Sequence, residues 1–185
     1  MQWRNTQARY GLVSAVFHWA VALAVFAMFG VGLYMVGLSY YDSLYNALPR
    51  WHRSVGMLLF AVVLARLIWR LISRPPPPPA GHSRFERFMA AAMHWVLYLL
   101  LFGLFVSGYL ISTADGRGFS LFNWFEVPAL TGRIPNLEDT AGLVHEWLAW
   151  VLIVLAALHA GAALKHHFVD RDETLVRMLG RSSRH

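Results

Sequence analysis

The side chains best suited to chemistry in this chain are histidines that fall inside apolar segments. The segment 144–167 is apolar enough to cross a bilayer, yet it carries His145 near its start and His159 near its end. On a helix, fourteen positions amount to about 1400°, so both side chains lie on nearly one face, roughly 21 Å apart along the axis. One metal ion cannot be bound by both histidines. Two separate cofactors can.

Depth in the membrane sorts five histidines into two layers. His52 and His145 are expected in the first turn of helices that start on the outer side. His18, His94 and His159 are expected roughly 8–11 Å in from the inner side, at ~1.5 Å of rise per residue. An ionisable side chain inside a bilayer is costly and is functional by default. Two outer and three inner imidazoles fit two haems, each held by two histidines.

Each histidine also has a structural interpretation, as a side chain bonded to a nearby carbonyl or facing lipid headgroups. Matched depths on several helices have no simple structural cause, so the joint pattern favours the cofactor interpretation. Depth pairs His52 with His145. It leaves either His18 or His94 as the partner of His159.

A weak internal repeat accompanies the histidines. The His-Trp pair at 18–19 is followed fourteen residues later by Gly32, and the pair at 94–95 is followed fourteen residues later by Gly108. The second and fourth apolar segments align in the same way, which suggests a duplicated helix pair. Taken alone, the repeat would favour pairing the first and third helices' histidines.

Four uninterrupted apolar runs decide the fold class. They each approach or exceed the ~20 residues that cross a bilayer, and they cover residues 11–37, 54–73, 89–112 and 142–165. The chain of 185 residues is 57% apolar, and these runs lack the regular polar faces of a soluble bundle. We therefore expect an all-α membrane protein, a four-transmembrane-helix bundle forming a single domain over 1–185.

Charge and cysteine content limit the function. Twelve of the sixteen Lys and Arg residues fall in the N-terminal tail, in the span 66–87 or from Lys165 onward, so the positive-inside rule puts both termini in the cytoplasm. The net charge of +6 thus reflects topology and not nucleic-acid binding. The absence of cysteine excludes iron–sulfur clusters and covalent haem attachment, so any haem is held non-covalently.

Other residues are candidates for a supporting role around a haem. Arg66 lies deep enough to pair with a haem propionate, whereas Arg70 is expected to reach the cytoplasmic headgroups. Four small residues would let a flat macrocycle approach the backbone: Ala141, Gly142, Ala160 and Gly161. His166 is expected at the inner interface. The remaining histidines, His82, His167 and His185, are expected to be solvated.

A histidine-lined metal or proton transporter is the main alternative chemistry. Transition-metal sites need three or four ligands at one depth, ideally with carboxylates. Glu146 is the one acid near these helices, and it points about 100° away from His145. Transporter sites often lie where a membrane helix is interrupted, and no proline interrupts the four apolar runs. Electron transfer is therefore the favoured function.

Taken together, these residues resemble the bacterial cytochrome b561 family, small dihaem cytochromes of the inner membrane. The chain is similar, more distantly, to the cytochrome b subunits of formate dehydrogenases and nickel–iron hydrogenases. The matching segments are FHW at 17–19, WH at 51–52, ARLIWRL…PPPPP at 65–79, HEWLA at 145–149, LHAGAALKHHF at 158–168 and DETLVRML at 172–179.

The resemblance implies two non-covalent haem b groups in a multi-pass protein of the bacterial inner membrane. An inner haem would lie between His18 and His159 and an outer haem between His52 and His145, with His94 as a near neighbour of the inner haem or a quinone contact. The family's usual partner is ubiquinone. An activity assigned within it is oxidation of superoxide at the outer face.

Outer-side residues fit this implied activity but have simpler interpretations. Four arginines could steer a small anion or could be ordinary loop charges: Arg50, Arg53, Arg117 and Arg133. Asn123, Trp124 and Glu126 are candidate quinone contacts. The competing function is a membrane anchor that relays electrons for a separate periplasmic dehydrogenase or hydrogenase.

Overall fold

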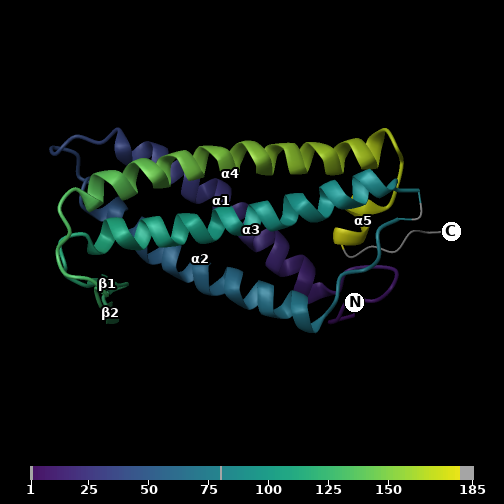
Figure 1. Ribbon diagram of the computed structural model, residues 1–185, viewed down its shortest axis with the longest axis horizontal. Helices are drawn as coiled ribbons and strands as arrows, with labels where there is room; N and C mark the ends of the chain where they lie inside the picture. Colours follow the sequence, from purple (N-terminus) through teal and green to yellow (C-terminus); the bar gives the residue numbers. More distant parts are fainter. Residues whose placement is uncertain (1, 80, 180–185) are drawn as a thin grey trace. The chain divides into compact units, whose positions relative to one another are not determined.

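The computed structural model describes residues 2–79 and 81–179, and it is dominated by four long helices (Figure 1). They are α1 (Leu12–Val36), α2 (Ala47–Ile72), α3 (Arg84–Thr113) and α4 (Leu137–Phe168). A two-stranded antiparallel hairpin, β1 (Phe119–Leu121) and β2 (Phe125–Val127), lies between α3 and α4. A short helix, α5 (Thr174–Met178), follows α4.

All four long helices have the length and composition to cross a membrane. Large apolar side chains remain exposed at mid-helix, including Leu23 (69% exposed), Leu99 (72%) and Leu158 (59%). Water would disfavour so much exposed apolar surface, whereas lipid would cover it at little cost. The predicted fold, a mostly helical protein with four membrane spans, is confirmed. The predicted cytoplasmic position of both termini stays a prediction.

Three of the helices begin earlier than their apolar runs. α2 begins at Ala47 and not near residue 54, and α3 and α4 each begin five residues before the predicted start. At the start of α3, Ser83 and Glu86 form a capping box: Ser83 N donates to Glu86 Oε2 at 2.8 Å, and Glu86 N donates to Ser83 Oγ at 3.2 Å. A polar, capped first turn thus extends α3 beyond its apolar run.

These earlier starts correct the predicted positions of the outer histidines. His52 lies in the second turn of α2, and His145 lies in the third turn of α4, whereas both were expected in first turns. The first turn of α4 is instead occupied by Glu138 and Asp139, which favour a helix N-terminus. Both histidines are therefore part of continuous helix.

The hairpin is a feature that the sequence did not predict. Its turn holds Phe122 and Asn123 at φ of 51° and 59°, and Trp124 N donates to the Leu121 carbonyl at 2.9 Å. Two consecutive positive φ angles are typical of a type I′ turn, which suits a tight hairpin. Phe122 N also donates to Ser54 Oγ at 3.2 Å, which ties the hairpin to α2.

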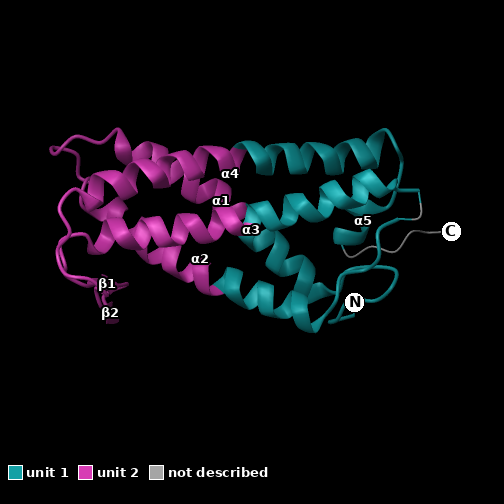
Figure 2. Cartoon of the chain, in the orientation of Figure 1, with its two compact units in different colours: residues 1–22, 62–97, 154–185 teal, residues 23–61, 98–153 magenta. Residues whose placement is uncertain are grey.

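The chain divides into two compact units (Figure 2). Unit 1 contains residues 1–22, 62–97 and 154–185, and unit 2 contains residues 23–61 and 98–153. Each of the four long helices contributes a segment to both units. The five histidines that were expected inside the membrane divide with the units: His18, His94 and His159 belong to unit 1, and His52 and His145 belong to unit 2.

Each unit is held by its own helix contacts. In unit 1, Trp69 Nε1 of α2 donates to Ser14 Oγ of α1 at 3.0 Å, and Val63 is fully buried. In unit 2, the ring of Phe60 on α2 packs against Phe105 of α3, with centroids 4.9 Å apart. These contacts hold together, within each unit, neighbouring helices that carry the histidines.

Candidate functional site

Unit 1 gathers side chains from all four long helices into an inner histidine cluster. His18 of α1 and His159 of α4 have ring centroids 6.3 Å apart, with an interplanar angle of 68°. His94 of α3 lies closer to His159, at 5.2 Å and 72°. Arg66 of α2 places Nη2 3.0 Å from His18 Nδ1. All four side chains that were predicted for the inner site therefore meet.

Unit 2 contains the outer histidine cluster. His52 of α2 and His145 of α4 have ring centroids 6.4 Å apart, with an interplanar angle of 72°. The outer pair thus repeats the spacing of His18 and His159 within 0.1 Å. Each pair joins a histidine of α4 to a histidine of another helix, and the two pairs have matched spacing. These pairs are the main geometric feature of the chain.

The spacing of these pairs fits a single metal ion between two imidazoles. A histidine nitrogen lies about 2.0–2.1 Å from a metal that it binds. Two such bonds in line, with half the width of each ring added, place the ring centroids roughly 6 Å apart. The pairs His18–His159 and His52–His145 have this spacing, whereas His94 and His159 are too close for an in-line arrangement.

Hydrogen bonding sets the tautomer of His145. Ser107 Oγ donates to the Gly103 carbonyl at 2.8 Å and lies 3.0 Å from His145 Nδ1. Because the hydroxyl proton is already used, Ser107 accepts the Nδ1 proton of His145. Nε2 then keeps its lone pair, as a metal-binding histidine requires.

The two candidates for the inner partner of His159 differ in tautomer. His94 Nδ1 donates to the Ala90 carbonyl at 2.7 Å, which leaves Nε2 with a lone pair. At His18, the Arg66 guanidinium can only donate, so Nδ1 accepts and the proton of a neutral ring sits on Nε2. Ring spacing favours His18, whereas the tautomer favours His94, so the contacts leave the inner pairing open.

Two glycines face the outer histidines. A Cβ placed on Gly108 would lie 3.3 Å from His145 Cε1, and one placed on Gly32 would lie 3.5 Å from His52 Cε1. His52 Nδ1 is also buried and has no hydrogen-bond partner among the residues described. Both glycines were noticed in the sequence as members of the repeat, but their role beside the outer imidazoles was missed. The fourteen-residue spacing was the available signal.

The predicted small residues differ in their surroundings. Ala141 is buried, whereas Ala160 and Gly161 are exposed within the chain. A Cβ placed on Gly142 or Gly161 would meet no atom within 4 Å. Open space at these positions is compatible with a macrocycle or with lipid. Their role beside a haem stays a prediction.

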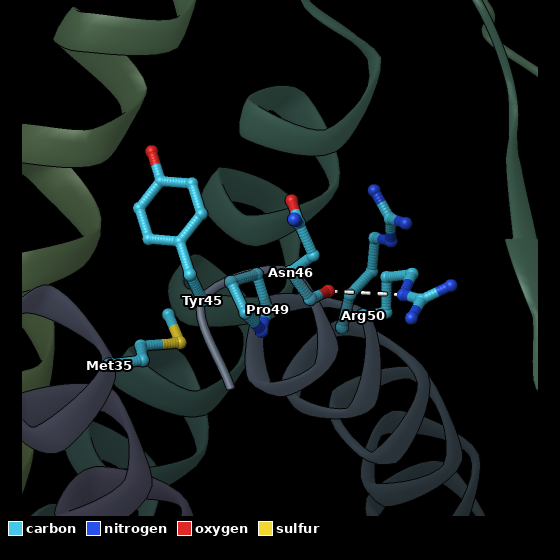
Figure 3. A pocket seen from close by; sticks show the side chains of 6 residues that line it. Met35, Tyr45, Asn46, Pro49 and Arg50 are labelled. Carbon is cyan, nitrogen blue, oxygen red and sulfur yellow. Dashed lines mark hydrogen bonds between the residues drawn. The ribbon is translucent and has the colours of Figure 1, made fainter. Parts of the chain in front are cut away.

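The outer arginines divide between a pocket and the surface. Arg50 and Arg53 line an open pocket of about 560 Å³, together with Met35, Tyr45, Asn46 and Pro49 (Figure 3). Arg50 Nε donates to the Asn46 carbonyl at 3.0 Å, and Arg53 lies over the Phe119 ring at 4.8 Å. Two cations facing one pocket make it a candidate anion site.

The other two outer arginines do not line this pocket, and Arg117 is already paired. Its side chain is 84% exposed and contacts Asp115 at 2.7 Å. That carboxylate accepts hydrogen bonds from the Arg117 backbone and side chain, which hold the pKa of Asp115 below its usual range. Arg133 is exposed. The candidate quinone residues Asn123, Trp124 and Glu126 belong to the exposed hairpin, and a quinone contact there stays a prediction.

A third group of side chains lies outside both clusters and corrects one prediction. His82 is not solvated: its side chain is 13% exposed, and Nε2 lies 2.7 Å from Asp172 Oδ2. Its ring stacks on that of His166, with centroids 4.6 Å apart. His167 is half-buried, and His185 lies outside the described residues.

The chain has four helices of membrane-spanning length, and they bring histidines together in pairs whose spacing fits a metal ion. These two features are typical of membrane cytochromes. A family model described as prokaryotic cytochrome b561 matches residues 9–181. The chain belongs to this family, as its motifs predicted, and is a multi-pass membrane cytochrome of electron transport. The family implies haem b as the cofactor.

Two of the bacterial relatives found match nearly the whole chain, and a third matches about two thirds of it. It is 51% identical to cytochrome b561 homolog 2 of Escherichia coli (strain K12), over 99% of this chain and 97% of the relative. It is 31% identical to cytochrome b561 homolog 1 of the same strain, over 94% and 98%. It is also 32% identical to a Yersinia pestis protein named "Probable superoxide oxidase CybB", over 69% and 72%.

Proposed function

We propose that this cytochrome holds two haem b groups and transfers electrons from superoxide on the periplasmic side to ubiquinone. The observation that carries the proposal is the pair of matched imidazole spacings, 6.3 Å and 6.4 Å, in separate units of the chain. Iron held by two histidines has no open position, so the chemistry that haem supplies is one-electron transfer and not oxygen binding.

For the outer haem, His52 and His145 are the proposed ligands. Ser107 orients the His145 ring and fixes its tautomer through the Nδ1 hydrogen bond. The adjacent glycines leave room for both rings beside α1 and α3: a Cβ at Gly108 would already press on His145 Cε1 at 3.3 Å, and one at Gly32 would touch His52 Cε1 at 3.5 Å. On His145, the Ser107 contact therefore leaves Nε2 available as a ligand without a rearrangement of protons.

For the inner haem, His18 and His159 are the proposed ligands, and the in-line spacing and the family resemblance support this choice. Arg66 then has to leave His18 Nδ1 and pair with a propionate, as a guanidinium does well with carboxylates. His94 keeps a free Nε2 lone pair at the same cluster. We assign it to hold a proton for the quinone.

Superoxide is the proposed donor because an anion suits the pocket that Arg50 and Arg53 line, and because one relative carries the name of a superoxide oxidase. Two superoxide ions, one ubiquinone and two protons would give two dioxygen molecules and one ubiquinol. The clustering of Lys and Arg near the termini supports a cytoplasmic position for both ends in the bacterial inner membrane.

The test is anaerobic stopped-flow mixing of the purified cytochrome with superoxide, followed by absorbance at the b-haem bands. We expect haem reduction that is faster than superoxide dismutation, and ubiquinol formation when ubiquinone is added. His52→Ala should abolish both signals while leaving the helical content of the protein unchanged.

An intact haem spectrum with no reduction by superoxide would contradict the superoxide part of the proposal. A cytochrome of that kind would behave as a relay subunit for a separate dehydrogenase. Reduction by a periplasmic dehydrogenase in the same assay would then establish the relay function.

A further inference from the structure

We propose that His82, His166 and Asp172 form a binding site for a divalent transition metal such as Zn²⁺, separate from both haem clusters. One ligand atom from each residue lies within 4.8 Å of the other two. Two imidazole nitrogens and one carboxylate oxygen are a donor set that zinc commonly takes. The site goes beyond the proposed function and does not depend on it.

The three residues come from three segments of unit 1. His82 belongs to the connector before α3, His166 lies near the end of α4, and Asp172 lies in the turn before α5. Their side chains are only 13–17% exposed. Half-buried donors from three segments form a more enclosed site than charges scattered on a surface.

The Asp172 carboxylate is oriented in the manner of a metal ligand. Its Oδ1 accepts a hydrogen bond from Thr174 N at 2.8 Å, which leaves Oδ2 directed at both histidines. Burial raises the pKa of Asp172, but hydrogen bonds from His82 and Thr174 outweigh it and hold the pKa below its usual range. The carboxylate is therefore an anion ready to bind a cation.

The geometry at His166 favours a shared ion over a simple ion pair. His166 Nδ1 lies 3.1 Å from Asp172 Oδ2 and 2.8 Å from Asp170 Oδ2, yet it makes no hydrogen bond of acceptable angle within the described part of the chain. A ligating imidazole nitrogen points its lone pair at the metal ion, so the other ligands of a tetrahedral ion lie off the lone-pair axis. The off-axis oxygens fit this arrangement.

The observed distances need only a small expansion to admit an ion. Ligand atoms around a tetrahedral zinc with bonds of about 2.0–2.2 Å are roughly 3.3–3.5 Å apart. Asp172 Oδ2 lies 2.7 Å from His82 Nε2 and 3.1 Å from His166 Nδ1, and the three ligand atoms all lie within 4.8 Å of one another. Binding would release the proton that His82 shares with Asp172. Asp170, which contacts Lys165 at 2.6 Å, or a water molecule would complete the fourth position.

A backbone feature joins the two aspartates. Arg171, which stands between them, has φ of 55°, in the left-handed region that residues other than glycine rarely adopt. This conformation brings Asp170 and Asp172 to the same imidazole. An ion bound here would link the connector before α3 to the segment that follows α4.

The test is zinc binding to the full-length, haem-loaded protein purified without a polyhistidine tag. A fluorescent chelator competes for Zn²⁺, and X-ray absorption at the zinc edge reports the ligands. We expect one Zn²⁺ per chain, with nitrogen and oxygen neighbours at about 2.0–2.2 Å and the scattering signature of two imidazoles. His166→Gln and Asp172→Asn should each weaken binding at least 10-fold.

His167→Gln is the matched control, because this histidine is next in sequence but has no part in the cluster. Its zinc affinity should equal that of the unmodified protein. The haem spectrum and the elution volume report whether each variant is folded, and the X-ray measurement on the unmodified protein stands without any variant. Absence of bound Zn²⁺, fewer than two imidazoles around it, or equal loss in the control would overturn the proposal.

Discussion

Ser107 Oγ lies 3.0 Å from His145 Nδ1 and donates its own proton to the Gly103 carbonyl at 2.8 Å, so it is placed to accept a proton from His145. The contact fixes which nitrogen of His145 remains free, and it comes from a side chain one helix away. It therefore connects the packing of α3 against α4 to the electronic state of the proposed outer ligand.

Removing this acceptor should loosen the outer haem. In Ser107→Ala, His145 Nδ1 loses the serine hydroxyl that orients it, and the ring is held less firmly. Outer-shell partners of this kind typically contribute about 10–100-fold to metal affinity. We expect haem dissociation from one of two sites to accelerate, measured by transfer to apomyoglobin. Ser112→Ala is the control, because Ser112 Oγ donates to the Gly108 carbonyl on the same helix; equal effects would contradict the assignment.

A larger side chain at Gly108 should displace the imidazole of His145. Valine at Gly108 brings a Cβ to 3.3 Å of His145 Cε1 and adds two methyl groups beyond it. We expect Gly108→Val to lose about half of the bound haem, as measured by the pyridine haemochrome assay. The same change at Gly30, where a Cβ meets nothing within 4 Å, has a similar cost in helix propensity and should retain both haems.

Arg66 should set the properties of the inner haem alone. Its guanidinium lies at His18 and is the proposed partner of a propionate. Replacing it with leucine removes a nearby positive charge, which favours the oxidised haem and so lowers the reduction potential. A potentiometric titration of Arg66→Leu should show one of two b haems shifted downward. Arg70→Leu should leave both potentials close to their original values.

The pocket arginines should control the rate of reaction with an anionic donor. In Arg50→Gln combined with Arg53→Gln, the second-order rate with superoxide should fall about 10-fold or more at low salt, since focused charge raises such rates by 10–10³. The deficit should shrink as ionic strength rises. The exposed Arg133→Gln variant provides the control, and a salt-independent deficit would point to a structural defect instead.

The four spans, the histidine clusters and the family could be predicted from the sequence because lipid imposes long apolar runs, and because buried histidines stand out within them. The starts of α2, α3 and α4 were predicted five or more residues late, since first-turn and capping residues such as Ser83 lie outside the apolar runs. The hairpin was missed because three-residue strands are too short to show alternation.

Contacts between distant segments were the other limit. Ser107 is one of two serines on α3, and nothing in the sequence links it to His145. His82 follows a proline-rich connector and was expected to be solvated, whereas Asp172, ninety residues later, pairs with it. Pairings of this kind depend on tertiary packing, which local pattern does not encode.

Haem content per chain tests the central claim most directly. Pyridine haemochrome quantitation and reduced-minus-oxidised spectra would be recorded for the unmodified protein and for His145→Ala, His159→Ala, His18→Ala and His94→Ala. We predict two haem b groups in the unmodified protein and one in each of the first three variants, with both retained in His94→Ala. A well-folded protein that binds no haem would contradict the proposed function, and loss of haem in His94→Ala but not in His18→Ala would reassign the inner ligand.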